Sequence, residues 1–348
     1  MSRRIWNFGI VGAGLIADFH ARAIRELPNA RLLGLFDNTP EKAEQLAIKF
    51  RAKAFDSLEA MLADPGIDIV TIATPSGAHA EPAIAAARAG KHVLCEKPLE
   101  ITLDRIDEMI AAHHAAGTML GGIFQNRFNP AMEPLRRAVA EERFGRITYA
   151  GVFVPWWRTD EYYSGSWHGT LAMDGGGALM NQSIHMIDML LDIVGPVRRV
   201  SAFAGTLGHT IEAEDTAVAV VEFAHGALGQ IFGTTASWPG RFKQFEMTGT
   251  RGTVVYVEDS FTEWRFADER AEDAVIRTRF GQVQSNGGGV ADPAAIGHHN
   301  HARNFAAFVE AVEKGQPFEI DASQARKAVE LILAIYKSAR EGKTLTLA

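Results

Sequence analysis

The fold is decided by the stretch Trp6-Asn7-Phe8-Gly9-Ile10-Val11-Gly12-Ala13-Gly14-Leu15-Ile16-Ala17. Its first half is an apolar run typical of a buried strand. Its second half has the pattern G-x-G-x-x-A and leads into helical spacing of apolar residues that ends at Leu27. The first glycine permits a tight turn, the second lets the backbone approach a pyrophosphate, and the alanine keeps helix and strand close. The motif therefore predicts a dinucleotide site at Gly12, Ala13, Gly14, Leu15 and Ile16.

An acidic residue ends the next expected strand, which covers residues 31–36. Asp37 lies roughly 20 residues after the glycines, where a carboxylate holds the ribose hydroxyls of a dinucleotide. Asn38 and Thr39 follow, and no arginine is present there to receive a 2′-phosphate. The sequence therefore predicts NAD as the cofactor, with NADP less favoured. An alternative role for Asp37 is a helix cap before Pro40, although Asn38 or Thr39 is also suited to that role.

Strands and helices alternate over the first third of the chain. The nearly continuous apolar run over residues 67–73 is typical of a parallel strand that is buried on both faces. A helix is expected from the N-cap Thr102 to Ala116, with Gly117 after its end. The alternation predicts an α/β protein whose residues 1–124 form a doubly wound, NAD-binding Rossmann domain. The strands are expected near residues 6–11, 31–36, 53–55, 67–73, 92–95 and 119–124.

One loop at the carboxyl edge of this sheet is Thr74-Pro75-Ser76-Gly77-Ala78-His79. It follows the expected strand 67–73 and lies at the same edge as the glycine turn, so it should touch the cofactor. Thr74, Pro75 and His79 are its predicted cofactor contacts. His79 has an alternative role as a partial cap of the helix that it opens.

A second loop at this edge is the turn Glu96-Lys97-Pro98, which follows the expected strand 92–95. Pro98 fixes its own φ and biases Lys97 away from helix, so the turn is stiff. A lysine in this position can bind an anion, or exchange a proton with a hydroxyl if its pKa is lowered. Glu96 and Lys97 are therefore predicted at the cofactor. The alternative is an ordinary surface lysine after a strand.

Residues 125–348 are expected to form a second domain, for substrate binding and oligomerisation. A helix is expected over 129–142, and the alternation over 216–220 indicates an antiparallel sheet with one covered face. The exposed face is suited to a dimer interface. A long loop is expected over 267–293, and two helices close the chain at 300–314 and 323–341. The strands are expected at 147–154, 197–206, 216–223, 227–235, 242–248 and 253–257.

One segment of the second half has polar residues at helical spacing. Gly175-Gly176-Gly177 leads into a helical pattern in which Asn181, His185 and Asp188 share a face. A polar face beside an apolar one is what a helix lining a cleft shows. The alternative is a packed helix with a hydrogen-bonded histidine.

An aromatic segment precedes it, Trp156-Trp157-Arg158-Thr159-Asp160-Glu161-Tyr162-Tyr163. Aromatic rings stack on sugar faces, and a guanidinium grips a carboxylate or phosphate. Trp157, Arg158 and Tyr163 are therefore candidate substrate contacts, while part of the segment is expected in the core. The segment His298-His299-Asn300-His301 has histidines, but no cysteine or acidic set accompanies it, so no metal site is predicted.

Composition excludes several classes of protein. The chain has 348 residues and a net charge of −7, which gives no basic footprint for nucleic acid or an anionic membrane. No apolar run approaches the ~20 residues of a membrane span. The single cysteine, Cys95, excludes an internal disulfide framework and favours a reducing cytoplasm. Its apolar neighbours predict a packed thiol rather than a nucleophile.

Four motifs in order, Gly12 to Ala17, Thr74 to His79, Glu96 to Pro98 and Gly176 to Asp188, make the chain similar to the Gfo/Idh/MocA family of NAD(P)-dependent oxidoreductases. The resemblance covers essentially the whole chain. It implies an N-terminal Rossmann domain, a C-terminal α/β domain with an open, mainly antiparallel sheet, and dimers or tetramers. Its members mostly oxidise or reduce one carbon of a sugar, inositol or sugar derivative.

Carried over from the family, Lys97 looks like the catalytic lysine and His185 like the active-site histidine. Asn181 stands where many members have an aspartate that would orient and charge the histidine, so this residue departs from the pattern. The sequence Met180-Asn181-Gln182 is similar to a subgroup that oxidises a sugar ring at C3, including nucleotide-sugar uronates.

The expected function is an NAD-dependent sugar or polyol dehydrogenase. Lys97 or His185 would accept the hydroxyl proton, and Asn181 would hydrogen-bond a substrate hydroxyl. The expected substrate contacts are Lys97, Trp157, Arg158, Tyr163, Asn181 and His185. One rival function is a glycoside hydrolase that uses NAD transiently, and another is a dinucleotide sensor without turnover.

Overall fold

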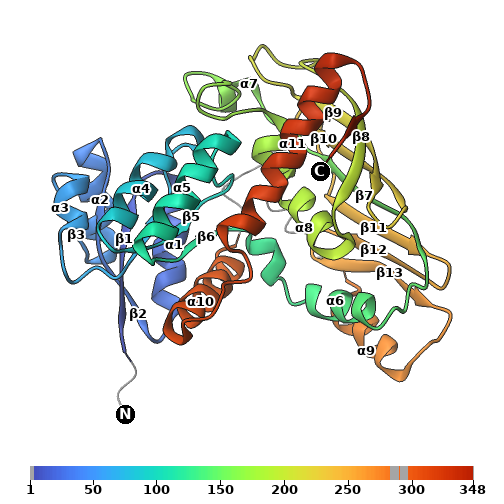
Figure 1. Ribbon diagram of the computed structural model, residues 1–348, viewed down its shortest axis with the longest axis horizontal. Coiled ribbons are helices and arrows are strands. Elements are labelled where there is room, and N and C mark those ends of the chain that lie inside the picture. Colours follow the sequence, from blue (N-terminus) through green and yellow to red (C-terminus); the bar gives the residue numbers. More distant parts are fainter. Residues whose placement is uncertain (1–3, 283–289, 291–296, 348) are drawn as a thin grey trace. The chain divides into compact units, whose positions relative to one another are not determined.

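The computed structural model describes residues 4–282, 290 and 297–347, and they belong to two compact units. Unit 1 comprises residues 1–128 and 297–329, and unit 2 comprises residues 129–296 and 330–348. This division differs from a single boundary after residue 124, because helix α10 (His299–Lys314) packs against helix α1 (Leu15–Glu26) in unit 1. Figure 1 shows the late-sequence α10 beside the early-sequence α1. A domain boundary at 124/125 stays a prediction.

The sheet of unit 1 has the strand order β3-β2-β1-β4-β5-β6, and every described pair in it is parallel. This is the doubly wound order expected from the sequence, and the predicted α/β class is confirmed. The order in which strands are added reverses between β1 and β4, because β2 and β3 lie on one side of β1 and the later strands on the other. Open α/β sheets bind ligands at this point. The strands are β1 (Trp6–Val11), β2 (Ala30–Phe36), β3 (Lys53–Ala54), β4 (Ile69–Ile72), β5 (His92–Cys95) and β6 (Leu120–Gly122).

The helices of unit 1 bury apolar faces against this sheet. Helix α5 (Leu103–Ala116) begins and ends as the sequence predicts: Thr102 Oγ1 accepts the Arg105 N–H, and Gly117 has the left-handed φ of +66°. No helix among the described residues is long and apolar enough to cross a membrane. The other helical segments are α2 (Pro40–Phe50), α3 (Leu58–Leu62), η1 (Ser76–Ala78), α4 (Ala80–Arg88), η2 (Gln125–Phe128) and the first part of α11 (Ala322–Glu341).

The sheet of unit 2 has the order β13-β12-β11-β7-β10-β9-β8-β14. It is mainly antiparallel as predicted, except that β10 and β7 run parallel, from Leu228↔Tyr149 to Thr234↔Pro155. The strands are β7 (Ile147–Pro155), β8 (Val197–Gly205), β9 (Thr216–Phe223), β10 (Leu228–Thr234), β11 (Gln244–Gly249), β12 (Gly252–Val257), β13 (Ser260–Phe266) and β14 (Leu345–Thr346).

The helices of unit 2 correct two expectations. The expected loop over 267–293 is wrong in its first part, because residues 271–280 form helix α9 (Ala271–Phe280). Buried Asp273 stabilises its start by accepting hydrogen bonds from the Arg143 guanidinium and the Trp264 indole. The helix expected over 129–142 is shorter. The other helical segments of unit 2 are α6 (Met132–Ala140), α7 (Asp160–Tyr163), the π-helix η3 (Ala178–Ser183), α8 (Ile184–Val194) and the second part of α11.

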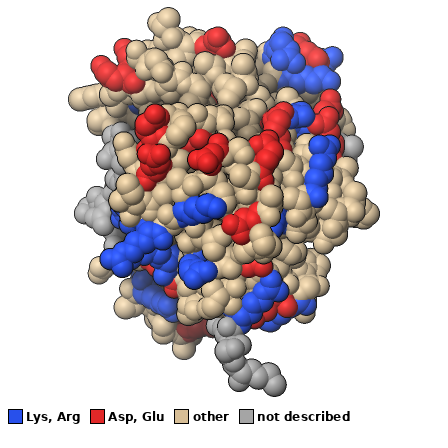
Figure 2. Space-filling model, turned by 90° about the vertical axis from the view of Figure 1, so that its left-hand side faces the viewer, with Lys and Arg blue, Asp and Glu red and all other residues tan. Residues whose placement is uncertain are grey.

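Charged side chains of both signs occur together on the face that Figure 2 shows. Ion pairs with at least one exposed partner include Arg22 with Asp18 and Lys314 with Glu310. Such pairs contribute only about 0–1 kcal/mol each, so burial of apolar side chains dominates the stability.

Candidate functional site

The glycine turn in unit 1 has the geometry of a dinucleotide site. Gly12 has φ +99°, and a Cβ added there would lie 2.6 Å from the Ala73 carbonyl oxygen, so only glycine lets β1 turn beside β4. A Cβ at Gly14 would meet nothing within 4 Å. Open space therefore lies in front of the α1 N-terminus, where backbone N–H groups attract phosphate. Leu15 is exposed beside it, and its contact with the cofactor stays a prediction.

Asp37 supports this turn from the end of β2. One carboxylate oxygen accepts the Ala13 N–H at 2.7 Å, and the other accepts the Thr39 N–H at 2.7 Å. Thr39 is the N-cap residue of α2, so Asp37 assists the cap without being the cap residue. The carboxylate thus lies beside the glycine turn, where the ribose of a bound dinucleotide would place its hydroxyls. Contact with the ribose stays a prediction.

We expect Asp37→Ala to change the ratio of the NADP and NAD dissociation constants at least tenfold in favour of NADP. The carboxylate repels a 2′-phosphate and accepts ribose hydroxyls, so its loss weakens NAD binding and relieves the repulsion. Titrations of both cofactors followed by tryptophan fluorescence measure this ratio. Asp56→Ala, which removes an exposed aspartate of the same unit, is the matched control. An unchanged ratio in a folded Asp37→Ala protein would reduce Asp37 to a structural residue.

His79 joins the two loops at the carboxyl edge. Its ring is buried, with Nδ1 at 2.8 Å from the Pro98 carbonyl oxygen and Nε2 at 3.0 Å from the Thr74 carbonyl oxygen. Burial lowers its pKa, although both carbonyls and Glu96 oppose the shift. The ring therefore fixes the loop after β4 against the turn after β5. Direct cofactor contact by Thr74, Pro75 or His79 stays a prediction.

A buried hydrogen-bonded cluster lies below the Glu96-Lys97 turn. Glu96 Oε1 is 3.0 Å from His20 Nε2 and 3.7 Å from His301 Nε2. The second nitrogen of His20 is 3.0 Å from Thr71 Oγ1. A neutral His20 satisfies both contacts, because it donates from Nε2 and accepts the threonine hydroxyl at Nδ1. The three ionisable side chains come from α1, the end of β5 and α10.

The electrostatics of this cluster favour an ionised Glu96. Burial by itself raises the pKa of the Glu96 carboxyl, but the hydrogen bond from His20 and the nearby imidazole of His301 outweigh it, and the pKa lies well below its ordinary value. Burial lowers the pKa of His20, although Glu96 opposes the shift. The cluster therefore holds a carboxylate next to Lys97, whose backbone N–H donates to Glu96 Oε2 at 2.9 Å.

Two groups of histidine and acidic residues in unit 1 have spacing that could suit a cation. The first is the cluster His20, Glu96 and His301, whose shortest contact is already a hydrogen bond. The second is Glu26 with His298 and His299, in which Glu26 Oε1 lies 2.8 Å from His298 Nε2 and 3.0 Å from His299 Nδ1. The segment 298–301 is thus divided, with His301 turned inward and His298 and His299 turned toward Glu26.

The catalytic candidate Lys97 follows this cluster directly. It is half-buried, and the peptide bond to Pro98 is cis. Cys95, two residues earlier, is fully buried, and burial raises its thiol pKa well above the ordinary value. The prediction of a packed, unreactive thiol agrees with this placement.

In unit 2, the π-helix η3 changes how the polar residues are related. Asn181 lies in η3, whereas His185 and Asp188 lie in α8. A π-helix has more residues per turn than an α-helix and occurs often at functional sites, so simple α-helical spacing does not place Asn181 relative to the other two. Asn181 and His185 are half-buried, while Asp188 is fully buried.

The glycine run before η3 encloses a carboxylate. A Cβ at Gly177 would overlap the Glu214 carbonyl oxygen, so this close approach requires glycine. The Glu214 carboxyl accepts the Gly177 N–H at 2.9 Å, the Leu179 N–H at 2.8 Å and the Tyr336 hydroxyl at 2.8 Å. Burial raises the pKa of Glu214 to about 7, despite these donors.

Glu214 is expected to make stability fall as the pH rises through neutrality. Because the pKa of Glu214 is raised in the folded protein, its contribution to the free energy of unfolding is fully present below pH 4.5, the ordinary pKa of a glutamate. This contribution is lost as the pH rises through about 7. The loss is at most about 3 kcal/mol of unfolding free energy. Urea unfolding between pH 5 and 8 should show a flatter pH dependence for Glu214→Gln, and an unchanged one for the control Glu212→Gln, which alters an exposed side chain. Equal slopes in wild type and Glu214→Gln would contradict the assignment.

The aromatic candidates surround a buried histidine of unit 2. The rings of Trp157 and Tyr163 lie 5.7 and 5.0 Å from the His209 ring. His209 Nδ1 is 3.1 Å from Asp215, and Nε2 is 2.9 Å from the Arg158 carbonyl oxygen. The structure thus brings Trp157, Arg158 and Tyr163 together around one ring.

Arg158 is buried rather than extended into solvent. Its Nη1 donates to the carbonyl oxygens of Trp157 at 2.8 Å and Val290 at 3.0 Å, and its guanidinium lies over the rings of Trp156 and Tyr162. Arg158 therefore stabilises this loop, and its contact with a substrate anion stays a prediction. The Tyr163 hydroxyl donates to Thr235 Oγ1 at 2.8 Å, and burial raises its pKa to about 12.

Several buried or half-buried polar residues next to the candidates belong to no recognisable sequence motif. They are His20, Asp174, His209, Glu214 and His301. The residues that they contact can be far away in the chain. The separation is 5 positions between Gly169 and Asp174 and 205 positions between Glu96 and His301. The one available signal was a polar residue on an otherwise apolar face, such as His20 between Phe19 and Ala21 in α1.

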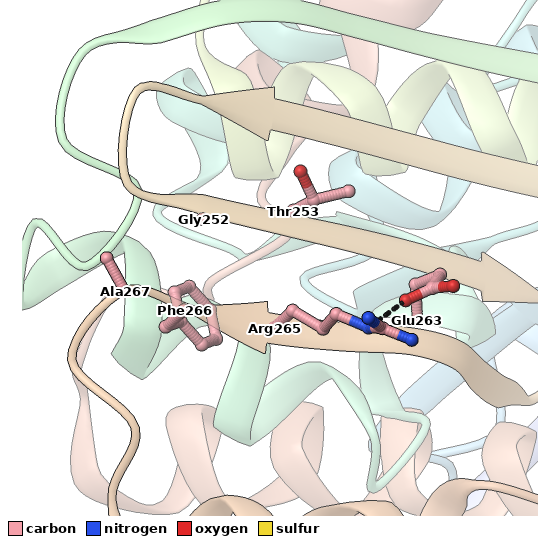
Figure 3. Close-up of a pocket in the computed structure, with 6 residues that line it drawn as sticks. All are labelled: Gly252, Thr253, Glu263, Arg265, Phe266 and Ala267. Carbon is pink, nitrogen blue, oxygen red and sulfur yellow. Dashed lines mark ion pairs between the residues drawn. The ribbon is translucent and has the colours of Figure 1, made fainter.

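A surface hollow of about 420 Å³ lies along β12 and β13, and none of the candidate residues lines it. Figure 3 shows its lining, which includes Phe266 and the ion pair of Arg265 with Glu263 at 2.8 Å. Because Arg265 is 79% exposed, the hollow is open and lacks the convergent polar groups of a ligand site.

Two family models match most of the chain. Residues 6–123 match the GFO/IDH/MocA oxidoreductase family, NAD-binding Rossmann fold, and residues 132–255 match a GFO/IDH/MocA C-terminal domain. The levoglucosan dehydrogenase of Pseudarthrobacter phenanthrenivorans is 29% identical over 328 residues, covering 84% of each chain. The myo-inositol 2-dehydrogenase of Thermotoga maritima is 27% identical over 357 residues, covering 98% of each.

A solved structure matches the whole chain. The WlbA dehydrogenase from Bordetella pertussis, in complex with NADH and UDP-GlcNAcA, is 33% identical, with a TM-score of 0.90, and the match covers 100% of this chain and 99% of that one.

Proposed function

The chain belongs to the GFO/IDH/MocA family of oxidoreductases, and from this membership we propose that it is an NAD-dependent dehydrogenase that oxidises C3 of the pyranose in a nucleotide-linked sugar uronate. The dependence on NAD and the sugar or polyol class follow from the family and its relatives. The observation that supports the finer substrate is the match to WlbA over the whole chain. The segment Met180-Asn181-Gln182 adds support because it is similar to the subgroup that oxidises C3.

The residues of this chain have separable roles in such a reaction. The open space before Gly14 and the N-terminus of α1 fit the pyrophosphate, and Asp37 fits the adjacent ribose. The bound NAD supplies the carbon that accepts the hydride. Lys97 and His185 are the candidate proton acceptors, and Asn181 is a hydrogen-bonding group for the substrate. That both units contribute to one active site is part of the proposal.

A substrate panel tests the proposed function. Wild-type protein with NAD is incubated with UDP-GlcNAcA, levoglucosan or myo-inositol, and NADH absorbance is followed. We expect the highest kcat/KM with UDP-GlcNAcA. A preference for levoglucosan or myo-inositol would contradict the nucleotide-linked substrate, and binding of NAD without turnover of any of them would favour a sensor. Release of an aglycone from a chromogenic glycoside without net NADH would favour the hydrolase.

We further propose that a second copy of the chain covers the open face of the unit 2 sheet. Phe203, Val218, Val220 and Leu228 on β8, β9 and β10 are 82%, 43%, 57% and 61% exposed. An apolar patch of this kind is typical of an interface. Analytical ultracentrifugation should give a mass of at least two 37.9 kDa chains, which Val220→Lys should reduce. A monomeric wild type would contradict this proposal. The predicted location in the cytoplasm stays a prediction.

A further inference from the structure

The orientation of the Asn181 amide is set by a carboxylate that belongs to the preceding loop. Asn181 Nδ2 donates to Asp174 Oδ1 at 2.6 Å, and the Gly169 N–H donates to Asp174 Oδ2 at 2.8 Å. Asp174 is only 1% exposed. It is therefore a fixed acceptor, held from one side by the backbone and facing Asn181 on the other.

The chemistry of the two groups determines which end of the amide faces Asp174. An ionised carboxylate only accepts hydrogen bonds, whereas an amide has a donating nitrogen and an accepting oxygen. The nitrogen must therefore face Asp174, because the opposite orientation would place two acceptors together. The Asn181 carbonyl oxygen then points away from Asp174.

We propose that Asp174 is a positioning residue that makes Asn181 present its carbonyl oxygen to the substrate, so that this point of the site recognises a hydrogen-bond donor. The inference rests on the proposed function, because it assigns a substrate contact to Asn181. The recognised group is a substrate hydroxyl or amide N–H. It keeps its hydrogen during the reaction, because the side-chain amide of Asn181 cannot accept a proton at useful pH. The group that Asn181 recognises is consequently not the hydroxyl that is oxidised.

The contact with Asp174 also determines the effect of replacing Asn181 by a carboxylate. Asn181→Asp alone places two carboxylates against each other in a buried position, and one of them must then take a proton or move. The double variant Asp174→Asn, Asn181→Asp restores one donor and one acceptor with their roles exchanged. It still presents an oxygen acceptor to the substrate from position 181.

The test compares Asp174→Asn, Asn181→Asp, the double variant and wild type. The midpoint of thermal unfolding measures how much the contact between Asp174 and Asn181 stabilises the protein. KM and kcat with NAD and UDP-GlcNAcA measure substrate recognition. We expect Asp174→Asn to raise KM roughly 3- to 10-fold, the cost of one hydrogen bond, with a smaller change in kcat. The double variant should return KM to within about threefold of wild type and recover the thermal midpoint that each single variant loses. Asp160→Asn, at an exposed position in the same unit, is the control.

The outcomes separate this inference from the proposed function. An active wild type with an unchanged KM in Asp174→Asn contradicts the inference alone. Recovery of the thermal midpoint without recovery of KM shows that the pair is only structural, which also overturns it. A wild type inactive on UDP-GlcNAcA, levoglucosan and myo-inositol contradicts the proposed function and the recognition step together, and the thermal cycle still decides whether Asp174 and Asn181 are coupled.

Discussion

Replacing Lys97 by methionine is expected to lower turnover by ~10²–10⁴-fold, the range for loss of general acid–base catalysis. Methionine keeps much of the apolar stem, and the backbone N–H of residue 97 still donates to Glu96, so the turn should survive. Binding of NAD, measured by fluorescence titration, should stay close to that of wild type. The loss should therefore appear in kcat measured with the best substrate of the panel.

Comparison with His185→Ala distinguishes the two candidate proton acceptors. If His185 is the acceptor, its loss should be as damaging as that of Lys97, and it should be milder if the histidine only shapes the pocket. Asn181→Ala is expected to be the mildest of the three, with a loss of about 0.5–1.5 kcal/mol in substrate binding. Lys42→Met, which changes an exposed lysine of unit 1, is the matched control. Near-wild-type turnover in both Lys97→Met and His185→Ala would show that the catalytic assignment is wrong.

Removing the donor from the buried Glu96 cluster is expected to destabilise the protein by about 3 kcal/mol, as for a buried charge that loses its partner. His20→Phe is the suitable change, because the new ring can keep the packing of His20 against Phe305, where the ring centroids lie 5.2 Å apart. It removes the hydrogen bonds to Glu96 and Thr71. The Glu96 carboxylate is then left buried without the side-chain donor at Oε1, and only the Lys97 backbone N–H still donates to Oε2.

A double-mutant cycle isolates this effect. Glu96→Gln removes the charge, so it should cost less in the His20→Phe background than in wild type, with a coupling above about 0.5 kcal/mol. Urea unfolding at neutral pH measures all four proteins. Arg22→Ala, an exposed change two residues along α1, is the control. Strict additivity of His20→Phe and Glu96→Gln would show that the two side chains do not stabilise each other.

The same cluster should lose stability in acid. The pKa values of Glu96 and His20 both lie below their ordinary values in the folded protein, so the unfolded chain binds more protons. Their contribution to the free energy of unfolding is complete above pH 6.5, the ordinary pKa of histidine, and declines as the pH falls below it. Below pH 4.5, the ordinary pKa of a glutamate, the contribution of Glu96 is lost as well. The His20→Phe, Glu96→Gln protein should show a weaker decline than wild type.

The sequence by itself determined the features that depend on neighbouring residues. Gly12 and the apolar strand before it specify a turn that other residues cannot adopt, and alternating apolar runs specify the doubly wound sheet. Thr102 and Gly117 likewise identify the ends of α5. These are local properties of the backbone and of short periodic patterns, so they can be read before the chain is folded.

Only the tertiary structure decided which distant side chains meet. The Glu96 cluster needs α10 to return to unit 1, and α9 is held by Asp273 through Arg143, 130 positions earlier. The parallel pairing of β7 with β10 and the π-helix that carries Asn181 leave no periodic signal either. Such contacts are selected by the packing of whole elements and by the need to satisfy buried polar groups, and neither is a property of a short stretch of sequence. The glycine turn and the Glu96-Lys97 turn of unit 1 could therefore be located from the sequence, whereas the carboxylate that contacts Asn181 appears only once the loop before η3 has folded.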